Sequence, residues 1–244
     1  MEKSYSEFEQ RFLDVEENLK VIRNRIGDAA VKSGRKPEDI TLLAATKTVP
    51  AEVINHAVSL GVGHIGENRV QELEQKYSAY DLEHCDLQFI GHLQTNKVKY
   101  LIGKVSMIQS VDNGKLANEI SRLSSAKSIG TDVLIEVNIG EEPNKSGVAP
   151  ADLGSLLEQI ASFPAVHVRG LMAIPPADAS EKETANYFFR MHQYFVDIKD
   201  KKIDNIAMDY LSMGMSADYP RAILAGANMV RIGTALFGPR NYQN

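Results

Sequence analysis

The chain has 244 residues, of which 43% are hydrophobic and 24% are charged, and its net charge at pH 7 is -5. These values suit a soluble globular protein with a sizeable core, and the acidic balance excludes a strong electrostatic footprint for nucleic acid. The single cysteine, Cys85, excludes an intrachain disulfide and a cysteine-based metal cluster. A polar, acidic N-terminus and the lack of an apolar run of about 20 residues predict no targeting peptide and no membrane helix, so we expect a cytoplasmic protein.

The chain opens with a pattern typical of an amphipathic helix. Apolar residues recur at alternating spacings of four and three from Phe8 to Ile26, which places them on one stripe of a helix. Gly34 and Pro37 then form a typical stop signal. Because this helix precedes the first expected strand, we expect residues 1–36 to pack on the outside of the fold.

Strand and helix patterns alternate along the rest of the chain. Several expected strands are short and almost wholly apolar, as in Val133–Val137, which favours strands buried on both faces of a parallel sheet. Strands are expected near residues 40–48, 62–66, 87–92, 106–111, 131–138, 167–174, 208–213 and 229–233. Helices are expected near residues 50–60, 68–77, 95–102, 114–125, 151–162, 181–199 and 217–226.

Eight strand–helix units in this length, with no linker rich in Gly, Ser or Pro, predict an α/β protein with a single (β/α)8 TIM barrel and an extra N-terminal helix. We expect residues 1–244 to form one domain. An open, doubly wound sheet is the structural alternative. In a barrel the functional residues lie at the carboxyl ends of the strands, so those ends supply the candidates for a site.

A lysine stands at the carboxyl end of the first expected strand. Lys47 stands at the end of an apolar run, just before Pro50. Burial of an ammonium lowers its pKa, and the neutral amine can attack an aldehyde to form a Schiff base. Position alone favours the alternative, in which the alkyl stem is buried while the ammonium reaches water.

Three other strand ends carry polar residues with two interpretations each. Asn68 follows the second strand and could cap the next helix or face a ligand. His92 follows the third strand, as a core histidine or as part of a polar cluster. Lys145 lies in the long polar loop after the fifth strand, which is either a solvated connection or a lid that brings this lysine to an anion.

The last two strands indicate an anion site. Ser216 stands at the start of the helix expected at 217–226, where a hydroxyl and backbone N–H groups bind anions, although a simple helix cap is the alternative. Gly233 and Thr234 follow the eighth strand, and the loops after strands seven and eight are the recurrent phosphate site of this barrel. Arg231 lies inside an apolar strand and needs an acceptor there.

A reactive lysine and a phosphate site at one barrel mouth predict a phosphorylated aldehyde as ligand. Pyridoxal 5′-phosphate (PLP) has an aldehyde, a phosphate and a ring nitrogen that Arg231 could face. A sugar phosphate in a Schiff-base aldolase shares the first two features, so spacing alone leaves both open.

Five segments of the chain carry a recognisable pattern: Ala44–Thr48, Gly66–Glu72, Phe89–Lys97, Leu211–Asp218 and Arg231–Gly238. With these segments, the chain from about residue 40 onward closely resembles the YggS/PROSC family, the pyridoxal phosphate homeostasis proteins. It departs from the family pattern at Arg69, where an aromatic residue is common, and at Leu87–Gln88, where Trp-His is common.

The resemblance implies a barrel similar to the N-terminal domain of alanine racemase, with PLP held on Lys47 as a Schiff base. It also implies that Arg231 faces the pyridine nitrogen and that Lys145 influences PLP exchange. The implied cofactor-binding residues are Lys47, Asn68, Met213, Ser216, Arg231, Gly233 and Thr234.

The resemblance and the residues together favour a carrier over an enzyme. A guanidinium disfavours a protonated pyridine, so PLP facing Arg231 would stabilise a carbanion poorly. Racemases that resemble this barrel add a second domain with an acid/base tyrosine, and only six residues follow Gly238, so we expect no such domain here. We therefore predict a monomeric protein of PLP homeostasis with little or no turnover, with no catalytic residues or metal, and with PLP-dependent apoenzymes as conceivable recipients. The alternative is a weak PLP-dependent amino-acid racemase.

Overall fold

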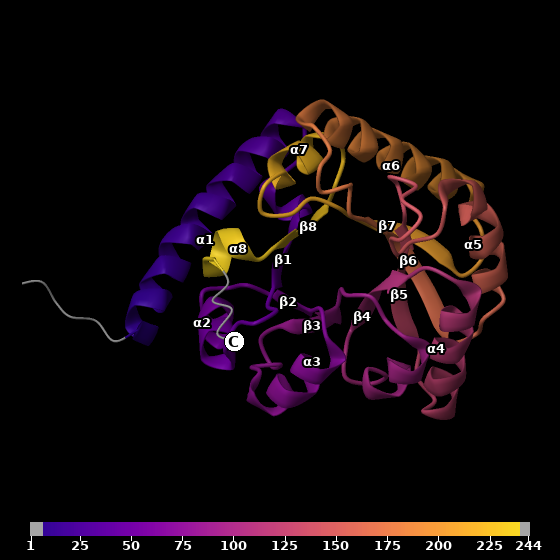
Figure 1. The fold of residues 1–244 in the computed structure, drawn as a ribbon, viewed down its shortest axis with the longest axis horizontal. Coiled ribbons are helices and arrows are strands. Elements are labelled where there is room, and N and C mark those ends of the chain that lie inside the picture. The colour runs from indigo at the N-terminus through magenta and orange to yellow at the C-terminus, as the bar shows by residue number, and fades with distance from the viewer. Residues whose placement is uncertain (1–6, 240–244) are drawn as a thin grey trace, which may run out of the picture.

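A computed structural model describes residues 7–239 of the chain. Eight parallel strands follow one another around a closed barrel in sequence order, and β8 pairs with β1 to close it (Figure 1). The predicted TIM barrel is therefore confirmed and the open sheet is wrong. The prediction of one domain over 1–244, with its outer segment 1–36, extends beyond the described residues and stays a prediction.

All eight expected strands are present, including the short second and fourth strands. The strands are β1 (Thr41–Ala45), β2 (His64–Glu67), β3 (Asp86–Phe89), β4 (Met107–Val111), β5 (Thr131–Val137), β6 (Val166–Ala173), β7 (Ile206–Ser212) and β8 (Met229–Ile232). The α-helices are α1 (Glu7–Lys32), α2 (Ala51–Ser59), α3 (Val70–Lys76), α4 (Gly114–Ala126), α5 (Leu153–Ala161), α6 (Glu181–Lys201), α7 (Tyr219–Leu224) and α8 (Thr234–Phe237). The 3₁₀ helices are η1 (Pro37–Asp39), η2 (Tyr77–Ala79), η3 (Thr95–Tyr100) and η4 (Pro150–Asp152).

Two helical predictions were wrong in detail. The segment expected as a helix at 95–102 is the 3₁₀ helix η3, which ends with the Leu101 amide donating to Val98 O three residues earlier. The helix expected at 217–226 begins only at Tyr219, because Met215 N donates to Asp218 Oδ1 (2.6 Å) and closes a separate turn before it. The four-residue helix α8 is too short to leave a periodic pattern, and the sequence did not predict it.

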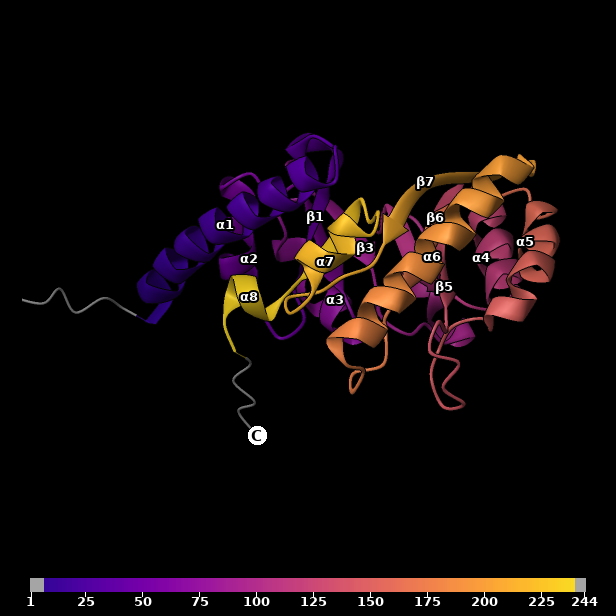
Figure 2. The same cartoon turned by 90° about the horizontal axis from the view of Figure 1, so that it is seen from above.

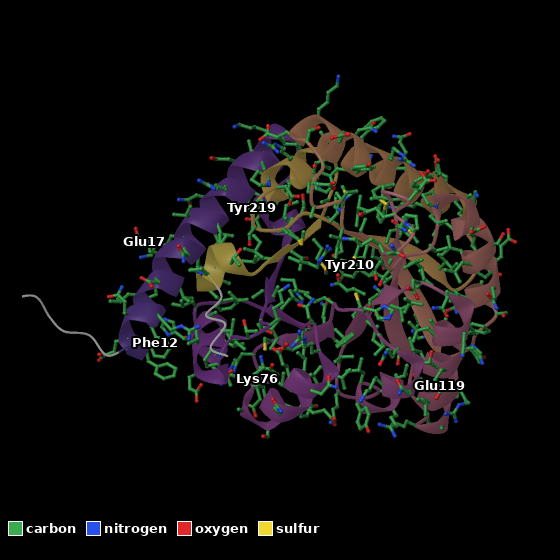
Figure 3. The ribbon with its side chains drawn as sticks, viewed as in Figure 1. Phe12, Glu17, Lys76, Glu119, Tyr210 and Tyr219 are labelled. Carbon is green, nitrogen blue, oxygen red and sulfur yellow. The ribbon has the colours of Figure 1, made fainter. Side chains whose placement is uncertain are left out.

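The barrel separates two apolar regions. The larger one lies between the strands and the surrounding helices. The smaller one fills the inside of the barrel as two clusters that both contact Tyr210, whose side chain lies within the ring of strands (Figure 3). The inner clusters are formed by Leu43, Ile90 and Met229, and by Met107, Leu134 and Met172. This filling makes the barrel interior a packed core, so a ligand site must lie at its mouth.

Helix α1 lies along the outside of the barrel against α2, α7 and α8, as both views show (Figures 1 and 2). Its apolar stripe is buried from Val15 to Ile26, with Leu19 only 2% exposed. Asn18 Nδ2 also donates to Leu236 O of α8 at 3.1 Å. The helix is therefore tied to the elements that follow β8 and the first strand.

Replacing Leu19 with Ala should lower the free energy of unfolding by about 2–5 kcal/mol, because it leaves a cavity between α1 and the barrel. Val21→Ala is the matched control on the same helix, since Val21 is 45% exposed and its change should stay within about 0.5 kcal/mol. Urea unfolding of the two variants measures both values. Equal effects would contradict the packing of α1 described above.

Candidate functional site

Lys47 lies in a turn just beyond the first strand. β1 ends at Ala45, whereas the strand expected at 40–48 includes Lys47. The amide of Val49 donates to Thr46 O at 3.0 Å and closes the turn around Lys47 and Thr48. Lys47 is partly buried. The sequence prediction therefore located the lysine at the correct rim of the barrel, but the structure places it on a turn and not within the strand.

Lys47 lines a cavity of about 640 Å³ at the carboxyl ends of β1 and β8. Gly233 and Thr234 line the same cavity, and so do Gln10, Arg11 and Asp14 of α1. A volume of this size is typical of small-molecule sites. The structure thus brings the candidate lysine and two candidate phosphate ligands into one space.

Ser216 lies next to this cavity through its contacts with the β8 loop. Its Oγ accepts hydrogen bonds from Gly233 N (3.3 Å) and Ala235 N (3.1 Å). It is not at the start of a helix as expected, because α7 begins at Tyr219. Gly214, in the loop that carries Ser216, adopts a φ of 91°, and an added Cβ there would lie 2.5 Å from Ala222 Cβ, so this loop packs too closely on α7 for a side chain at that position. A hydroxyl and two amides that converge in this way form a cradle that suits an anion.

Arg231 points into the barrel and is held by uncharged oxygens. It is 4% exposed, and it donates from Nη1 to Ser212 Oγ (2.6 Å) and from Nη2 to Ala173 O (3.0 Å). Burial lowers the pKa of Arg231 to about 10, which leaves it cationic at pH 7. Ser212 Oγ in turn donates to Gln109 Oε1 (2.7 Å), and Gln109 Nε2 donates to Gln88 Oε1 (2.6 Å). These hydrogen bonds connect Gln88, Gln109, Ser212 and Arg231 into a buried polar layer across the barrel.

Glu136 belongs to the same end of the barrel, and sequence reasoning missed it. It is 8% exposed on β5. Burial, together with the negative charge of Asp112, raises the pKa of Glu136 to about 7, although the charge of Arg231 acts in the opposite direction. The available signal was a carboxylate within the otherwise apolar run Val133–Val137. Gln88, which departs from the family pattern, is likewise part of the polar layer.

Asn68 does not cap the following helix, and its side-chain oxygen is left unsatisfied within the described part of the chain. Its Oδ1 is buried without a hydrogen-bond partner among the described residues. The residue that precedes α3 as its cap is Arg69, so the interpretation of Asn68 as the helix cap was wrong. An unsatisfied buried acceptor is costly and is expected where a ligand supplies the donor. Asn68 therefore fits the edge of a binding site.

The remaining candidates are less closely connected to the cavity. Met213 is fully buried in the core outside the barrel, and its contact with a ligand stays a prediction. His92 is exposed and its Nδ1 lies 3.0 Å from Ser146 Oγ, so the interpretation as a core histidine was wrong. Lys145 is exposed in the loop after β5, which Figure 2 shows projecting away from the barrel.

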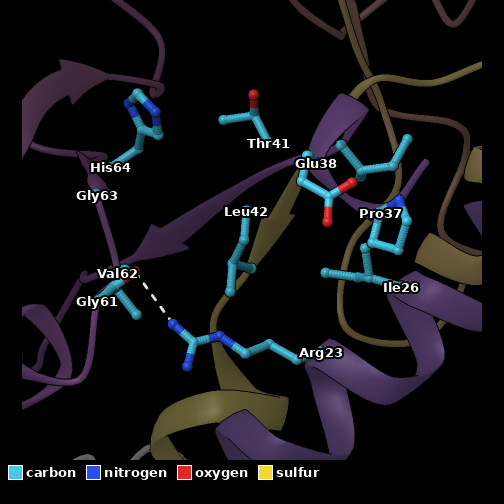
Figure 4. A pocket seen from close by; sticks show the side chains of 11 residues that line it. Arg23, Ile26, Pro37, Glu38, Thr41, Leu42, Gly61, Val62, Gly63 and His64 are labelled. Carbon is cyan, nitrogen blue, oxygen red and sulfur yellow. Dashed lines mark hydrogen bonds between the residues drawn. The ribbon is translucent and has the colours of Figure 1, made fainter.

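A second cavity, of about 480 Å³, lies at the opposite end of the strands (Figure 4). It is lined by the first residues of β1 and β2 and by Arg23, whose Nη2 donates to Gly61 O at 3.1 Å. In TIM barrels the amino ends of the strands serve stability and the carboxyl ends carry the chemistry. The cavity beside Lys47 is therefore the candidate functional site.

Two further findings limit the kinds of site present. Within residues 7–239, no cluster of three or more His, Cys, Asp or Glu side chains is arranged to bind a metal ion. The same part of the chain contains no helix with both the length and the apolar character needed to cross a membrane.

Comparison with known proteins connects this chain to a family. A sequence model of the alanine racemase N-terminal domain family matches residues 14–241. The pyridoxal phosphate homeostasis protein of Aquifex aeolicus (strain VF5) is 46% identical over 228 residues, which cover 93% of this chain and 98% of that protein. PipY of Synechococcus elongatus PCC7942, in a structure with PLP bound, is 31% identical with a TM-score of 0.80, over 92% of this chain and 100% of PipY. Alanine racemase of Clostridium difficile 630, in complex with cycloserine, has a TM-score of 0.72 over 94% of this chain and 60% of the racemase chain, and at 18% identity it shows the fold alone.

Glu136→Gln should change how stability depends on pH. Because the folded-state pKa is about 7 and the ordinary value is 4.5, the stabilising contribution of protonated Glu136 is complete below pH 4.5 and is lost as the pH rises toward 7. The wild type should therefore lose on the order of 3 kcal/mol relative to the glutamine variant between pH 4.5 and 7.5.

Urea unfolding of both proteins across this pH range measures the difference. Glu158→Gln, on an exposed position of α5, should give a curve parallel to the wild type. A Glu136→Gln curve that is also parallel would show that Glu136 ionises normally.

Proposed function

This chain belongs to the alanine racemase N-terminal domain family and, within it, to the pyridoxal phosphate homeostasis proteins, and we propose that it binds PLP as a Schiff base on Lys47 in PLP homeostasis or carriage. The observation that carries this proposal is the cavity that Lys47 shares with Gly233 and Thr234. The name of the Aquifex relative and the PLP in the PipY structure support the choice of cofactor.

The residues present fit PLP. The hydroxyl of Ser216 and the amides that converge on it suit a phosphate, and Thr234 adds an exposed hydroxyl beside them. The unsatisfied Oδ1 of Asn68 is an acceptor for a ligand donor. When bound, PLP supplies an aldehyde that condenses with an amine and a ring that withdraws electrons. We assign the phosphate to Ser216, Gly233 and Thr234, and the ring to Asn68, Met213 and Arg231.

Arg231 supports a carrier with little or no turnover. The guanidinium is oriented by Ser212 Oγ and Ala173 O, so its position depends on the barrel and not on a ligand. A fixed cation opposite a ring nitrogen disfavours protonation of that nitrogen and weakens the electron sink that amino-acid chemistry requires. We further propose that the protein is a cytoplasmic monomer and that PLP-dependent apoenzymes receive the cofactor. A weak PLP-dependent amino-acid racemase is the second candidate, because the barrel has the fold of alanine racemase.

Lys47→Ala should abolish the absorbance band at about 420 nm that PLP gives when bound as a Schiff base, a band that borohydride bleaches. The variant removes the amine that forms the linkage. Lys32→Ala is the control, because it removes an exposed lysine at the end of α1, outside the cavity, and should keep the band. Mass spectrometry of the reduced wild type should find the pyridoxyl group on residue 47. A bleachable band that persists in Lys47→Ala would disprove the assignment.

Purified wild type supplied with PLP and L-alanine should form no more D-alanine than Lys47→Ala does. The expected reason is the cationic partner of the ring nitrogen, Arg231. Chiral chromatography of the amino acid over several hours measures the rate. Steady racemisation that requires Lys47 would support the racemase and refute the carrier.

A further inference from the structure

The turn that carries Lys47 has an unfavourable backbone. Thr48, the residue after Lys47, adopts a φ of 63°. This left-handed region is rarely occupied by a β-branched residue, because its side chain crowds the backbone there. Such a conformation persists only where the surrounding structure over-determines it, and it is commonest at functional sites. The groups that hold this turn are therefore of interest.

A single ammonium holds both ends of the turn. Lys76, the last residue of α3 and labelled in Figure 3, donates from Nζ to Thr46 O and to Val49 O, each at 3.2 Å. The same Nζ lies 2.5 Å from Glu67 Oε1. The Lys76 side chain is 17% exposed, so these contacts are largely shielded from water. Two carbonyls and a carboxylate match the three donors of an ammonium.

Two carboxylates complete the arrangement. Glu72 Oε2 accepts from the backbone amide of Thr48 at 2.9 Å and lies 3.7 Å from Lys76 Nζ. Glu67 is fully buried, and its Oε1 also accepts from Thr46 Oγ1 (2.8 Å) and from Tyr80 OH (2.6 Å). Burial and the charge of Glu67 raise the pKa of Tyr80 well above its ordinary range, which keeps the phenol a donor. We call Glu67, Glu72 and Lys76 the turn clamp.

Stability alone is a weak explanation for the turn clamp. A buried ion pair often contributes no more to stability than apolar residues of the same size, because desolvation offsets the attraction. Here the ammonium is aimed at the backbone on both sides of Lys47. A contact that served stability alone could form elsewhere in the fold, and its hydrogen bonds would not need to converge on this one turn.

We propose that the turn clamp positions Lys47, with Lys76 as the principal positioning residue. This inference rests on the proposed function, in which Lys47 forms a Schiff base with PLP. An amine attacks a carbonyl efficiently only from a narrow range of positions, and a displacement of about 1 Å can cost on the order of 100-fold in rate. The clamp acts through the backbone of the turn, since none of its three residues lines the cavity.

Lys76→Met tests the inference, because it keeps an unbranched side chain of similar size and removes every donor. At matched PLP occupancy, this variant should form the borohydride-reducible linkage on residue 47 roughly 10- to 100-fold more slowly than the wild type. Without PLP, the amides of Thr48 and Val49 should exchange with deuterium at least tenfold faster. Lys104→Met is the matched control. Lys104 pairs with Glu74 of α3 (3.4 Å), the helix that ends at Lys76, and does not contact the turn. It should match the wild type in both readouts.

A second pair of variants covers the case in which Lys76→Met does not fold. Glu72→Ala removes the acceptor of the Thr48 amide and should also slow linkage formation. Glu72→Gln keeps an acceptor oxygen at that position and should restore a rate close to the wild type. If Glu72 served stability alone, its variants would lower the urea midpoint, but the rate of linkage formation would not differ between Glu72→Ala and Glu72→Gln.

The outcomes distinguish a failure of the turn clamp from a failure of the proposed function. Wild-type rates of linkage and of amide exchange in folded Lys76→Met, or in Glu72→Ala, would overturn the clamp and leave the proposed function standing. A wild type without any linkage on residue 47 would overturn the proposed function and, with it, the role of the clamp in positioning Lys47. Amide exchange would then still show whether Lys76 holds the turn.

Discussion

Pairing of β8 with β1 is the constraint on which the site depends. The register runs from Thr41 opposite Met229 to Ala44 opposite Ile232, and it closes the barrel. Closure places the carboxyl end of the first strand beside that of the last, so Lys47 and Gly233 share a cavity despite their distance in sequence. Helix α1 covers the same seam from outside. An open sheet would leave the amine and the anion cradle at opposite edges.

The barrel interior contains both apolar and polar groups. Apolar clusters around Tyr210 share it with a hydrogen-bonded layer that contains Gln109, Ser212 and Arg231. Burying such groups is costly unless every donor finds an acceptor, and a connected chain of hydrogen bonds meets that requirement. The consequence is a rigid cation below the mouth. Glu136 adds a carboxyl with a pKa near neutrality to the same layer, so the charge of this region depends on pH.

The amine and the cation are held by different means. Arg231 is fixed by the barrel interior, while the turn of Lys47 is held from outside the barrel by Lys76, Glu67 and Glu72. Both arrangements use buried polar groups whose net effect on stability is small. Under the proposed function, they set the position of a cofactor and limit its reactivity, which suits a protein that holds PLP and releases it.

The sequence by itself determined the fold class, because apolar periodicity reports burial locally and the order of strands follows the chain in this barrel. It also placed Lys47, Ser216 and Gly233 at one rim, since parallel strands share their carboxyl ends. Only the tertiary structure decided that Ser216 precedes a helix instead of starting it, and that Glu67 and Lys76 hold the turn. Those contacts depend on strand register, barrel closure and the approach of a neighbouring helix, and a local pattern of residues carries no record of which distant side chain will meet a given backbone atom.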